Sequence, residues 1–287
     1  MFTDWQTVKR HWKGYNALNH LVIFGASYCD VGYSSKEPHP CKERPLGVEF
    51  PGRTYNEPGE PNWVGHIVRD LSPCSSSPLL AYDYAVGGQD VHGVGWQVDK
   101  LFLPDVGKKP EWARWCEEDT LFITWVGIND CARAAFAQST HEASLKRLFV
   151  AQDKLYENGA RNFLFIDVPP LHRLRNSAFG AQLASNFAAS FETWNKFLRA
   201  EASLFSERHE DATVMIFSSW KLFSAVLDHP ETYGFSLADA TRSGGKIWVD
   251  NLHPTSKMHG VIAEEMVSFL NNVPADDPPL RQMNCSS

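Results

Sequence analysis

The sequence predicts an α/β fold in which a parallel β-sheet is covered by helices on both faces. Short apolar runs that suit buried strands recur along the chain, and segments with helical spacing of apolar residues separate them. Strands that alternate with helices form parallel sheets, because each crossover helix packs on a face of the sheet. The 287 residues suffice for one large domain with long loops. We expect a single domain over residues 1–275 and a mobile tail over residues 276–287.

Five segments are predicted as buried strands. The first, "LVIF" at 21–24, ends at Gly25, and a glycine permits a tight exit from a strand. The others are "LLAYDYAV" at 79–86, "TLFITWVG" at 120–127, "NFLFIDV" at 162–168 and "TVMIF" at 213–217. Ligands of open α/β sheets bind at the carboxyl ends of strands, so the residues that follow these runs are candidates for a functional site.

Four segments show helical patterns: residues 61–72, 141–160, 181–207 and 255–272. The first has Pro61 near its start, and Thr255 is a predicted N-cap of the last. In the second segment we expect a C-cap at Gly159. Its expected buried face consists of Leu145, Leu148, Phe149, Gln152 and Leu155. Residues 35–60 and 228–246 lack clear periodicity, and we expect these two long loops to contact a substrate.

Composition and charge limit the classes of partner. The net charge of −7 gives no general attraction to phosphate backbones, so nucleic acid is not an expected partner. No run of 18 apolar residues is present, so no membrane span is expected. The first 20 residues lack the apolar core of a signal peptide. This favours an intracellular protein, or an extracellular one if a leader is missing.

The six cysteines are dispersed, with no CxxC pair and no zinc-ligand spacing. Their disulfide state stays open, and we expect neither a metal nor an organic cofactor. Nothing in the sequence demands a second subunit, so a monomer is expected.

Small or polar residues follow three of the predicted strands. Ser27 follows the first, Gly87 and Gly88 follow the second, and Asn129 follows the third. Each has an ordinary structural interpretation when it is taken alone. A serine after a strand can cap a helix, two glycines can form a tight turn, and an asparagine can form an Asx turn or a helix cap.

The segment "WVDNLHPT" near the C-terminus places Asp250 three residues before His253. A nucleophilic serine needs an imidazole base, and the base needs an acceptor on its other nitrogen. An Asp-x-x-His turn supplies both the base and the acceptor. The alternative is a helix N-cap beside a surface histidine.

With these residues in place, the sequence resembles the SGNH (GDSL-type) hydrolases over most of the chain and in the right order. "FGASY" is similar to the first block of that family, "YAVGGQD" to the second, "VGIND" to the third and "DNLHP" to the last. The segments "PNWVGHI", "WVGIND" and "VDNLHPT" together are most similar to fungal acetyl esterases of carbohydrate esterase family 16. One departure is Ala26, where the family has an aspartate that helps to brace the block.

The resemblance implies a three-layer α/β/α sandwich with a five-stranded parallel sheet of flavodoxin-like order. It implies a serine esterase that removes acetyl groups from carbohydrates, with Ser27 as nucleophile, His253 as base and Asp250 as its partner. The oxyanion would be held by the N–H groups of Ser27 and Gly88 and by the amide of Asn129. Gly88 is preferred to Gly87 by similarity to the family block alone.

Two alternatives remain. A lipase or thioesterase would need an apolar channel for a longer acyl chain, whereas a small pocket walled by tryptophan would favour acetyl. Trp63, Trp125 and Trp248 lie beside the motifs, although tryptophan in such positions is more often packed in the core. The second alternative is a non-catalytic carbohydrate-binding relative, which the alanine at position 26 keeps open.

Overall fold

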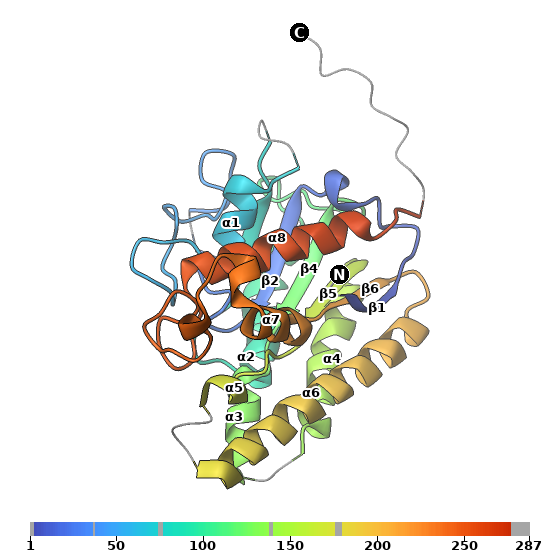
Figure 1. Ribbon diagram of the computed structural model, residues 1–287. Coiled ribbons are helices and arrows are strands. Elements are labelled where there is room, and N and C mark those ends of the chain that lie inside the picture. The colour runs from blue at the N-terminus through green and yellow to red at the C-terminus, as the bar shows by residue number, and fades with distance from the viewer. Residues whose placement is uncertain (1–2, 37, 74–76, 138–139, 176–179, 277–287) are drawn as a thin grey trace.

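The computed structural model describes residues 3–36, 38–73, 77–137, 140–175 and 180–276. Figure 1 shows a central sheet with helices on both of its faces. Helices α1 (Trp63–Asp70) and α8 (Ser256–Asn272) pack together on one face, and α4 (Glu142–Glu157) and α6 (Gly180–Arg208) lie on the other. The predicted three-layer α/β/α arrangement is therefore confirmed.

All five predicted strands are present and run parallel to one another. They are β2 (His20–Gly25), β3 (Leu80–Asp83), β4 (Thr120–Trp125), β5 (Asn162–Ile166) and β6 (Thr213–Phe217). Their order across the sheet is β3-β2-β4-β5-β6. This is the flavodoxin-like order that the family resemblance implied.

The prediction of five strands is incomplete, because a sixth strand, β1 (Thr3–Thr7), pairs antiparallel with β6 at the edge of the sheet. Its sequence, TDWQT, contains no apolar run. An edge strand pairs on one side only and does not need the continuous apolar sequence of a central strand. Apolar periodicity therefore could not find it.

The four predicted helical segments form α1, α4, α6 and α8. Thr255 caps α8 as predicted, by accepting a hydrogen bond from the Met258 N–H at 3.2 Å. The expected face of α4 is buried throughout. The C-cap of α4 is Asn158, and Gly159 follows it with a φ of +104°, so the predicted cap is one residue late.

The sequence patterns missed several shorter helices. These are α2 (Val91–Trp96), which continues into η2 (Gln97–Phe102), α3 (Ile128–Ala137), α5 (His172–Arg175) and α7 (Ser219–Asp228). Short 3₁₀ turns are η1 (Tyr15–Ala17), η3 (Val106–Lys108), η4 (Pro230–Tyr233) and η5 (Leu237–Ala240). The last two lie within one of the loops that showed no periodicity. Such short elements span too few turns to establish a helical period.

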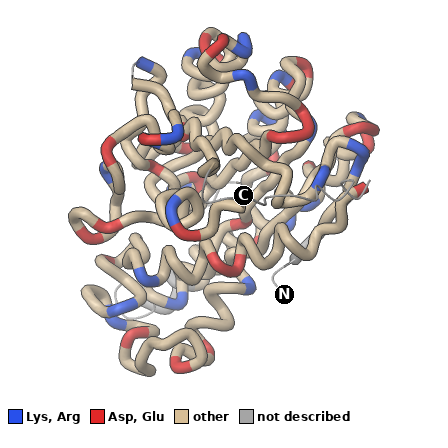
Figure 2. The backbone as a smooth tube through the Cα atoms, turned by 90° about the horizontal axis from the view of Figure 1, so that it is seen from above, with Lys and Arg blue, Asp and Glu red and all other residues tan. Residues whose placement is uncertain are grey.

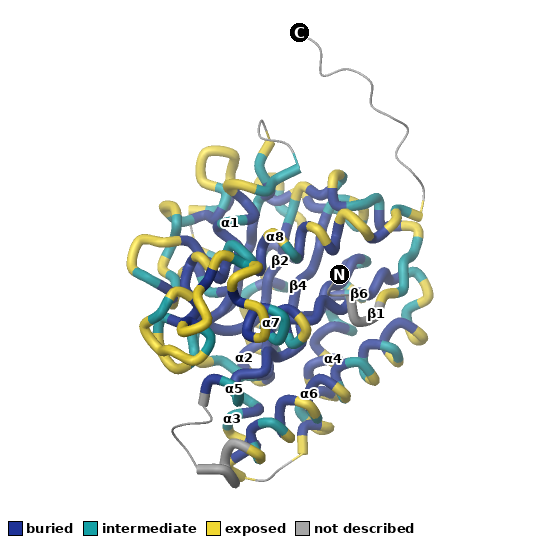
Figure 3. The backbone as a smooth tube through the Cα atoms, viewed as in Figure 1, coloured by how far each residue is buried: buried dark blue, intermediate teal, exposed yellow. Residues whose placement is uncertain are grey.

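The burial of residues differs between the sheet and the loops. The strands are buried, whereas the loops at one side of the sheet are the most exposed part of the chain (Figure 3). Acidic and basic residues are interspersed over the surface (Figure 2). In the part of the chain that is described, no helix is long and apolar enough to cross a membrane. The expected mobile tail lies outside the described residues, apart from Asp276.

Four cysteines fall within the described residues, and all are free thiols: Cys29, Cys41, Cys116 and Cys131. Cys74 and Cys285 lie outside the described residues, so their disulfide state stays open.

One buried carboxylate joins three elements near the end of β5. Asp167 is fully buried and accepts hydrogen bonds from the Ser218 hydroxyl at 2.7 Å and the Trp220 N–H at 2.8 Å, at the start of α7. Arg199 of α6 lies 3.5 Å from the same carboxylate. A negative charge at a helix N-terminus is favourable, because the N–H groups there lack partners within the helix. Asp167 therefore stabilises the start of α7, where Ser218 is the N-cap.

We expect Asp167→Ala to lower the free energy of unfolding by about 2 to 5 kcal/mol, because the Ser218 hydroxyl and the Trp220 N–H lose this buried acceptor. Asp228→Ala is the control, since it removes an exposed carboxylate 2.6 Å from Arg173. That change should cost less than about 1 kcal/mol. Urea denaturation of both variants measures the difference, and equal small losses would contradict the role assigned to Asp167.

Candidate active site

The turn that follows β2 places Ser27 at the carboxyl edge of the sheet, between β3 and β4. Gly25 is the last residue of β2 and packs closely on β4. A Cβ at this position would lie 2.2 Å from the Trp125 carbonyl oxygen. The buried Gln97 side chain accepts from the Gly25 N–H at 3.0 Å and donates to its carbonyl at 2.9 Å. Ser27 itself is 8% exposed. The glycine thus permits close contact between strands, and the glutamine fixes the point where the chain leaves the sheet.

Further hydrogen bonds hold the turn after Ser27. The buried Asn62 amide donates to the carbonyl oxygens of Cys29 at 2.8 Å and Asp30 at 3.1 Å. The Asp30 carboxylate accepts from the Gly32 N–H and, across the site, from the Gly87 N–H, both at 2.8 Å. Burial raises the pKa of Asp30, and these N–H groups oppose the rise. A carboxylate four positions after Ala26 therefore braces this turn against the loop that follows β3.

The two glycines after β3 have different surroundings. The N–H of Gly87 is used by Asp30, and a Cβ on Gly87 would lie 1.9 Å from the Tyr55 hydroxyl oxygen. Gly88 has a φ of +79°, and a Cβ there would meet nothing within 4 Å. The left-handed backbone favours glycine at position 88, and at position 87 any side chain would displace the ring of Tyr55. Since the Gly87 N–H is occupied, Gly88 is the better placed of the two for a ligand.

Asn129 lies in the first turn of α3, directly after β4. Its amide nitrogen donates to the Gln89 carbonyl oxygen at 2.8 Å. The amide has two N–H groups, so this bond leaves a second donor. The contact is with the neighbouring loop, and it differs from the Asx turn or helix cap that was the structural alternative. It draws the loops after β3 and β4 together.

His253 lies between Ser27 and Asp250. Its Nε2 is 3.1 Å from the Ser27 Oγ, and its Nδ1 is 2.8 Å from one Asp250 oxygen. The other Asp250 oxygen accepts from the N–H groups of Leu252 at 2.7 Å and His253 at 2.6 Å. Partial burial would raise the pKa of Asp250, but hydrogen bonds from the His253 ring and from these N–H groups hold the pKa below its usual range. Asp250 is therefore an ionised acceptor that orients the imidazole.

The turn that carries His253 is docked on the turn after β2. The Tyr28 hydroxyl donates to the Leu252 carbonyl at 2.5 Å, and the buried Trp248 anchors the preceding segment in the core. Thr255 caps the following helix. Asp250 is thus outside that helix, and the alternative of Asp250 as its N-cap is wrong.

The tryptophans beside the motifs do not wall this site. Trp63, Trp125 and Trp248 are each at most 2% exposed and belong to the core, which was their ordinary interpretation. The exposed aromatic ring beside His253 is Tyr55, which lies in a predicted substrate-contacting loop and was not singled out in the sequence. Gln97, Asn62 and Asp30 were also missed. Their importance depends on contacts with residues distant in the sequence, and only the Gly-rich and polar context of the motifs hints at them.

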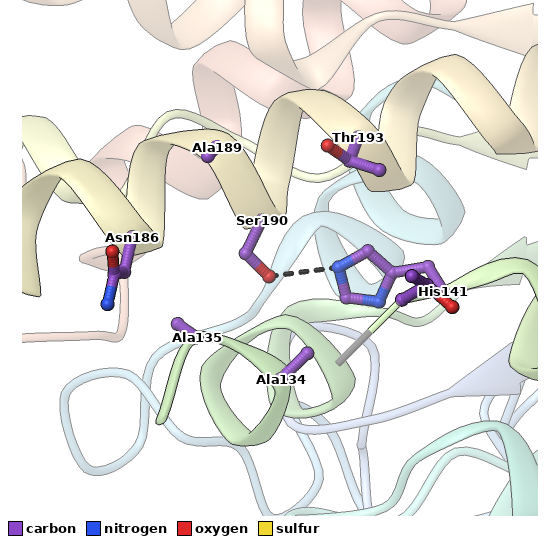
Figure 4. Close-up of a pocket in the computed structure, with 8 residues that line it drawn as sticks. Ala134, Ala135, His141, Asn186, Ala189, Ser190 and Thr193 are labelled. Atoms are coloured by element: carbon purple, nitrogen blue, oxygen red, sulfur yellow. Dashed lines mark hydrogen bonds between the residues drawn. The ribbon is translucent and has the colours of Figure 1, made fainter. Parts of the chain in front are cut away.

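A second serine–histidine pair lies between α3 and α6, beside a cavity of about 340 Å³ (Figure 4). The Ser190 hydroxyl donates to the Cys131 carbonyl at 2.9 Å, and His141 Nε2 is 2.9 Å from the same hydroxyl oxygen. Burial lowers the pKa of His141, which keeps the ring neutral. Because the serine proton points to the carbonyl, the imidazole acts as donor here. This pair joins two helices and lacks the arrangement of a nucleophile with its base. In a third pair, His66 Nε2 lies 3.1 Å from the Ser256 hydroxyl oxygen, and that hydroxyl donates to the Pro61 carbonyl at 2.7 Å.

Among the described residues, no three His, Cys, Asp or Glu side chains gather in a way that could hold a metal ion.

The chain is similar in sequence and in fold to known esterases and acylhydrolases. The family model described as GDSL-like Lipase/Acylhydrolase matches residues 21–266. An acetylesterase of Thermothelomyces thermophilus is 29% identical over 269 residues, covering 86% of this chain and 87% of that protein. The structure of Axe2, an acetylxylan esterase of Geobacillus stearothermophilus, superposes with a TM-score of 0.54 at 11% identity and covers 88% of this chain and 94% of that one. At this low identity the superposition shows a shared fold.

Asp130, next to Asn129, makes the stability of this region depend on pH. One of its oxygens accepts from the Val91 N–H at 3.3 Å, and the other is buried without a partner. Burial, with a contribution from nearby Asp90, raises the pKa of Asp130 from 3.8 to about 6. The pKa of Asp130 is higher in the folded protein than in the unfolded chain. The contribution of its protonated form to stability is therefore fully present below pH 3.8 and is lost as the pH rises through 6.

We expect the wild type to lose up to about 3 kcal/mol of stability between pH 4 and pH 7 relative to Asp130→Asn, which is neutral at every pH. The asparagine oxygen can still accept from Val91. Urea denaturation of both proteins at pH 4, 5.5 and 7 measures this difference. Parallel stability curves would contradict the raised pKa of Asp130.

Proposed function

The chain belongs to the GDSL-like lipase/acylhydrolase family, and from this membership we propose that it is a serine esterase that removes acetyl groups from carbohydrates. The observation that carries the proposal is the line of contacts Ser27 Oγ to His253 Nε2 at 3.1 Å and His253 Nδ1 to Asp250 at 2.8 Å. These are hydrogen-bond distances for a nucleophile, its base and the group that orients the base.

In the proposed mechanism His253 takes the proton of the Ser27 hydroxyl as the oxygen attacks the acyl carbon. Asp250 accepts from Nδ1, which selects the tautomer with a free Nε2 and stabilises the imidazolium that forms. The protonated His253 then donates to the leaving alcohol oxygen. Water, activated by the same imidazole, hydrolyses the acyl-enzyme.

The oxyanion of each tetrahedral intermediate would be held by three donors. These are the backbone N–H groups of Ser27 and Gly88 and the second N–H of the Asn129 amide. The structure supports this set because Gly88 is unobstructed and because the Gln89 contact holds the Asn129 amide beside the same loop. Donors fixed before the reaction stabilise developing charge without reorganisation.

The choice of acetyl esters rests on the relatives. The similar protein from Thermothelomyces thermophilus is an acetylesterase, and Axe2 is an acetylxylan esterase. Tryptophan residues give no support, since those beside the motifs are core residues. The alternative of a non-catalytic carbohydrate-binding relative depended on Ala26. The contacts of Asp30, Asn62 and Gln97 weaken it, because they hold the serine turn without a carboxylate at position 26.

The proposal predicts that the protein hydrolyses 4-nitrophenyl acetate and acetylated xylo-oligosaccharides, with lower kcat/KM for butyrate and octanoate esters. Ser27→Ala should lower kcat by at least about 10⁴-fold, as loss of a serine nucleophile does in a triad enzyme. Its denaturation midpoint should stay near that of the wild type, since the hydroxyl contributes little to packing. Absence of turnover by the wild type would favour a binding protein, and preference for octanoate would favour a lipase.

Asn129→Ala separates a role in the oxyanion hole from a role in holding the loop. An amide that donates to the oxyanion binds more strongly in the transition state, so kcat should fall by about 10² to 10³ with little change in KM. Loss of the contact with Gln89 alone should cost about 1 kcal/mol of stability and leave kcat nearly unchanged. Kinetics and urea denaturation of the same variant decide between them. Full activity in a destabilised variant would remove Asn129 from the oxyanion hole.

A further inference from the structure

Tyr55 contacts two parts of the site that come from different elements. Its ring stacks on the His253 ring, with centroids 5.3 Å apart and planes inclined by 30°. The phenol end of the same ring packs on Gly87, where even a methyl group would overlap it. Tyr55 nevertheless remains 39% exposed. It therefore presents an aromatic surface to solvent directly beside the imidazole and the loop after β3.

The segment around Tyr55 is fastened on both sides. Before it, the Arg53 N–H donates to the Val31 carbonyl at 2.9 Å, in the turn that follows Ser27. After it, the Glu57 carboxylate accepts from the Ser256 N–H at 2.7 Å, at the start of α8. The buried Asn56 side chain donates to a backbone carbonyl within the same loop at 2.7 Å. These bonds hold the ring in place before a ligand arrives, which lowers the entropy cost of binding.

The chemistry of the site decides which part of a substrate meets this ring. His253 must protonate the leaving alcohol oxygen, so the alcohol part of the ester lies beside the imidazole. The oxyanion and the short acyl group lie toward the donors after β2, β3 and β4. The face of Tyr55 that lies on His253 is therefore beside the alcohol part, while its phenol end reaches the loop after β3.

We propose that Tyr55 is a specificity-determining residue that binds the sugar ring of the alcohol part of the substrate. This inference rests on the proposed function. A pyranose ring has C–H groups on its faces and hydroxyl groups around its edge, and an exposed aromatic ring with a polar end offers both kinds of contact. The ring of Tyr55 supplies the apolar contact and its hydroxyl supplies a hydrogen-bonding group.

The experiment compares Tyr55→Ala and Tyr55→Phe with the wild type on acetylated xylo-oligosaccharides and on ethyl acetate. Both substrates carry the same acyl group, and only the first has a sugar as alcohol. For Tyr55→Ala we expect kcat/KM on the sugar ester to fall by about 10- to 100-fold, chiefly through KM, because binding contacts remote from the reacting bond are lost. Ethyl acetate hydrolysis should change less than about threefold. Tyr55→Phe retains the ring and should keep most of the preference for the sugar ester.

Trp112→Ala is a matched control, because Trp112 is also 39% exposed and also stacks on a histidine. The centroids of the Trp112 and His39 rings are 3.5 Å apart. It should leave the ratio of the two activities unchanged. An equal loss on both substrates in Tyr55→Ala would mean that Tyr55 only positions His253, and would overturn the proposal. The proposal would also be overturned if Tyr55→Ala increased the rate on ethyl butyrate relative to ethyl acetate and left the preference for sugar esters unchanged. Tyr55 would then lie on the acyl side.

Failure of this inference and failure of the proposed function give different results. If the protein is not an acetylesterase, the wild type hydrolyses neither acetate. If only the role of Tyr55 is wrong, the wild type hydrolyses both, and Tyr55→Ala leaves their ratio unchanged or alters only the acyl preference.

Discussion

The contact between Ser27 and His253 joins residues 226 positions apart, and the rest of the structure is arranged to make it possible. Parallel pairing of β3, β2 and β4 brings the carboxyl ends of three strands to one edge. The turn that carries His253 returns to this edge because Trp248 is buried and Tyr28 binds the Leu252 carbonyl. A shift of either turn by about 1 Å would weaken a contact on which a proton transfer depends.

Rigidity at this edge is obtained at some cost in stability. Burial raises the pKa values of the Asp30 and Asp130 carboxyls, so the ionised form of each is less favourable in the folded protein than in water. Asp30 accepts from the Gly87 N–H in the loop that follows β3, and Asp130 accepts from the Val91 N–H at the start of α2, where that loop ends. A loop with two consecutive glycines has little intrinsic rigidity. The two carboxyls hold it where Gly88 is left open to a ligand.

The sequence was most informative where local chemistry and topology coincide. Continuous apolar runs identified the five parallel strands, because strands buried on both faces are predominantly apolar. The residues after them included Ser27, the pair Gly87 and Gly88, and Asn129, and only similarity to the family block selected Gly88. The edge strand Thr3–Thr7 was missed since nothing requires it to be apolar. Gln97, Asn62, Asp30 and Tyr55 were missed for another reason. Each contacts a residue at least 30 positions away in the sequence, and a local sequence pattern cannot predict such a contact.

The central claim is that Ser27 with His253 is built for nucleophilic attack. In the pairs Ser190 with His141 and Ser256 with His66, the serine hydroxyl instead donates to a backbone carbonyl. Labelling with a fluorophosphonate, followed by mass spectrometry of the digested protein, tests it most directly. A serine activated by its base reacts with this reagent, and one whose proton is held by a carbonyl does not. We predict a single adduct on Ser27 that is absent from a folded His253→Ala variant. An adduct on Ser190 or Ser256, or no adduct in a preparation that hydrolyses acetyl esters, would contradict the account.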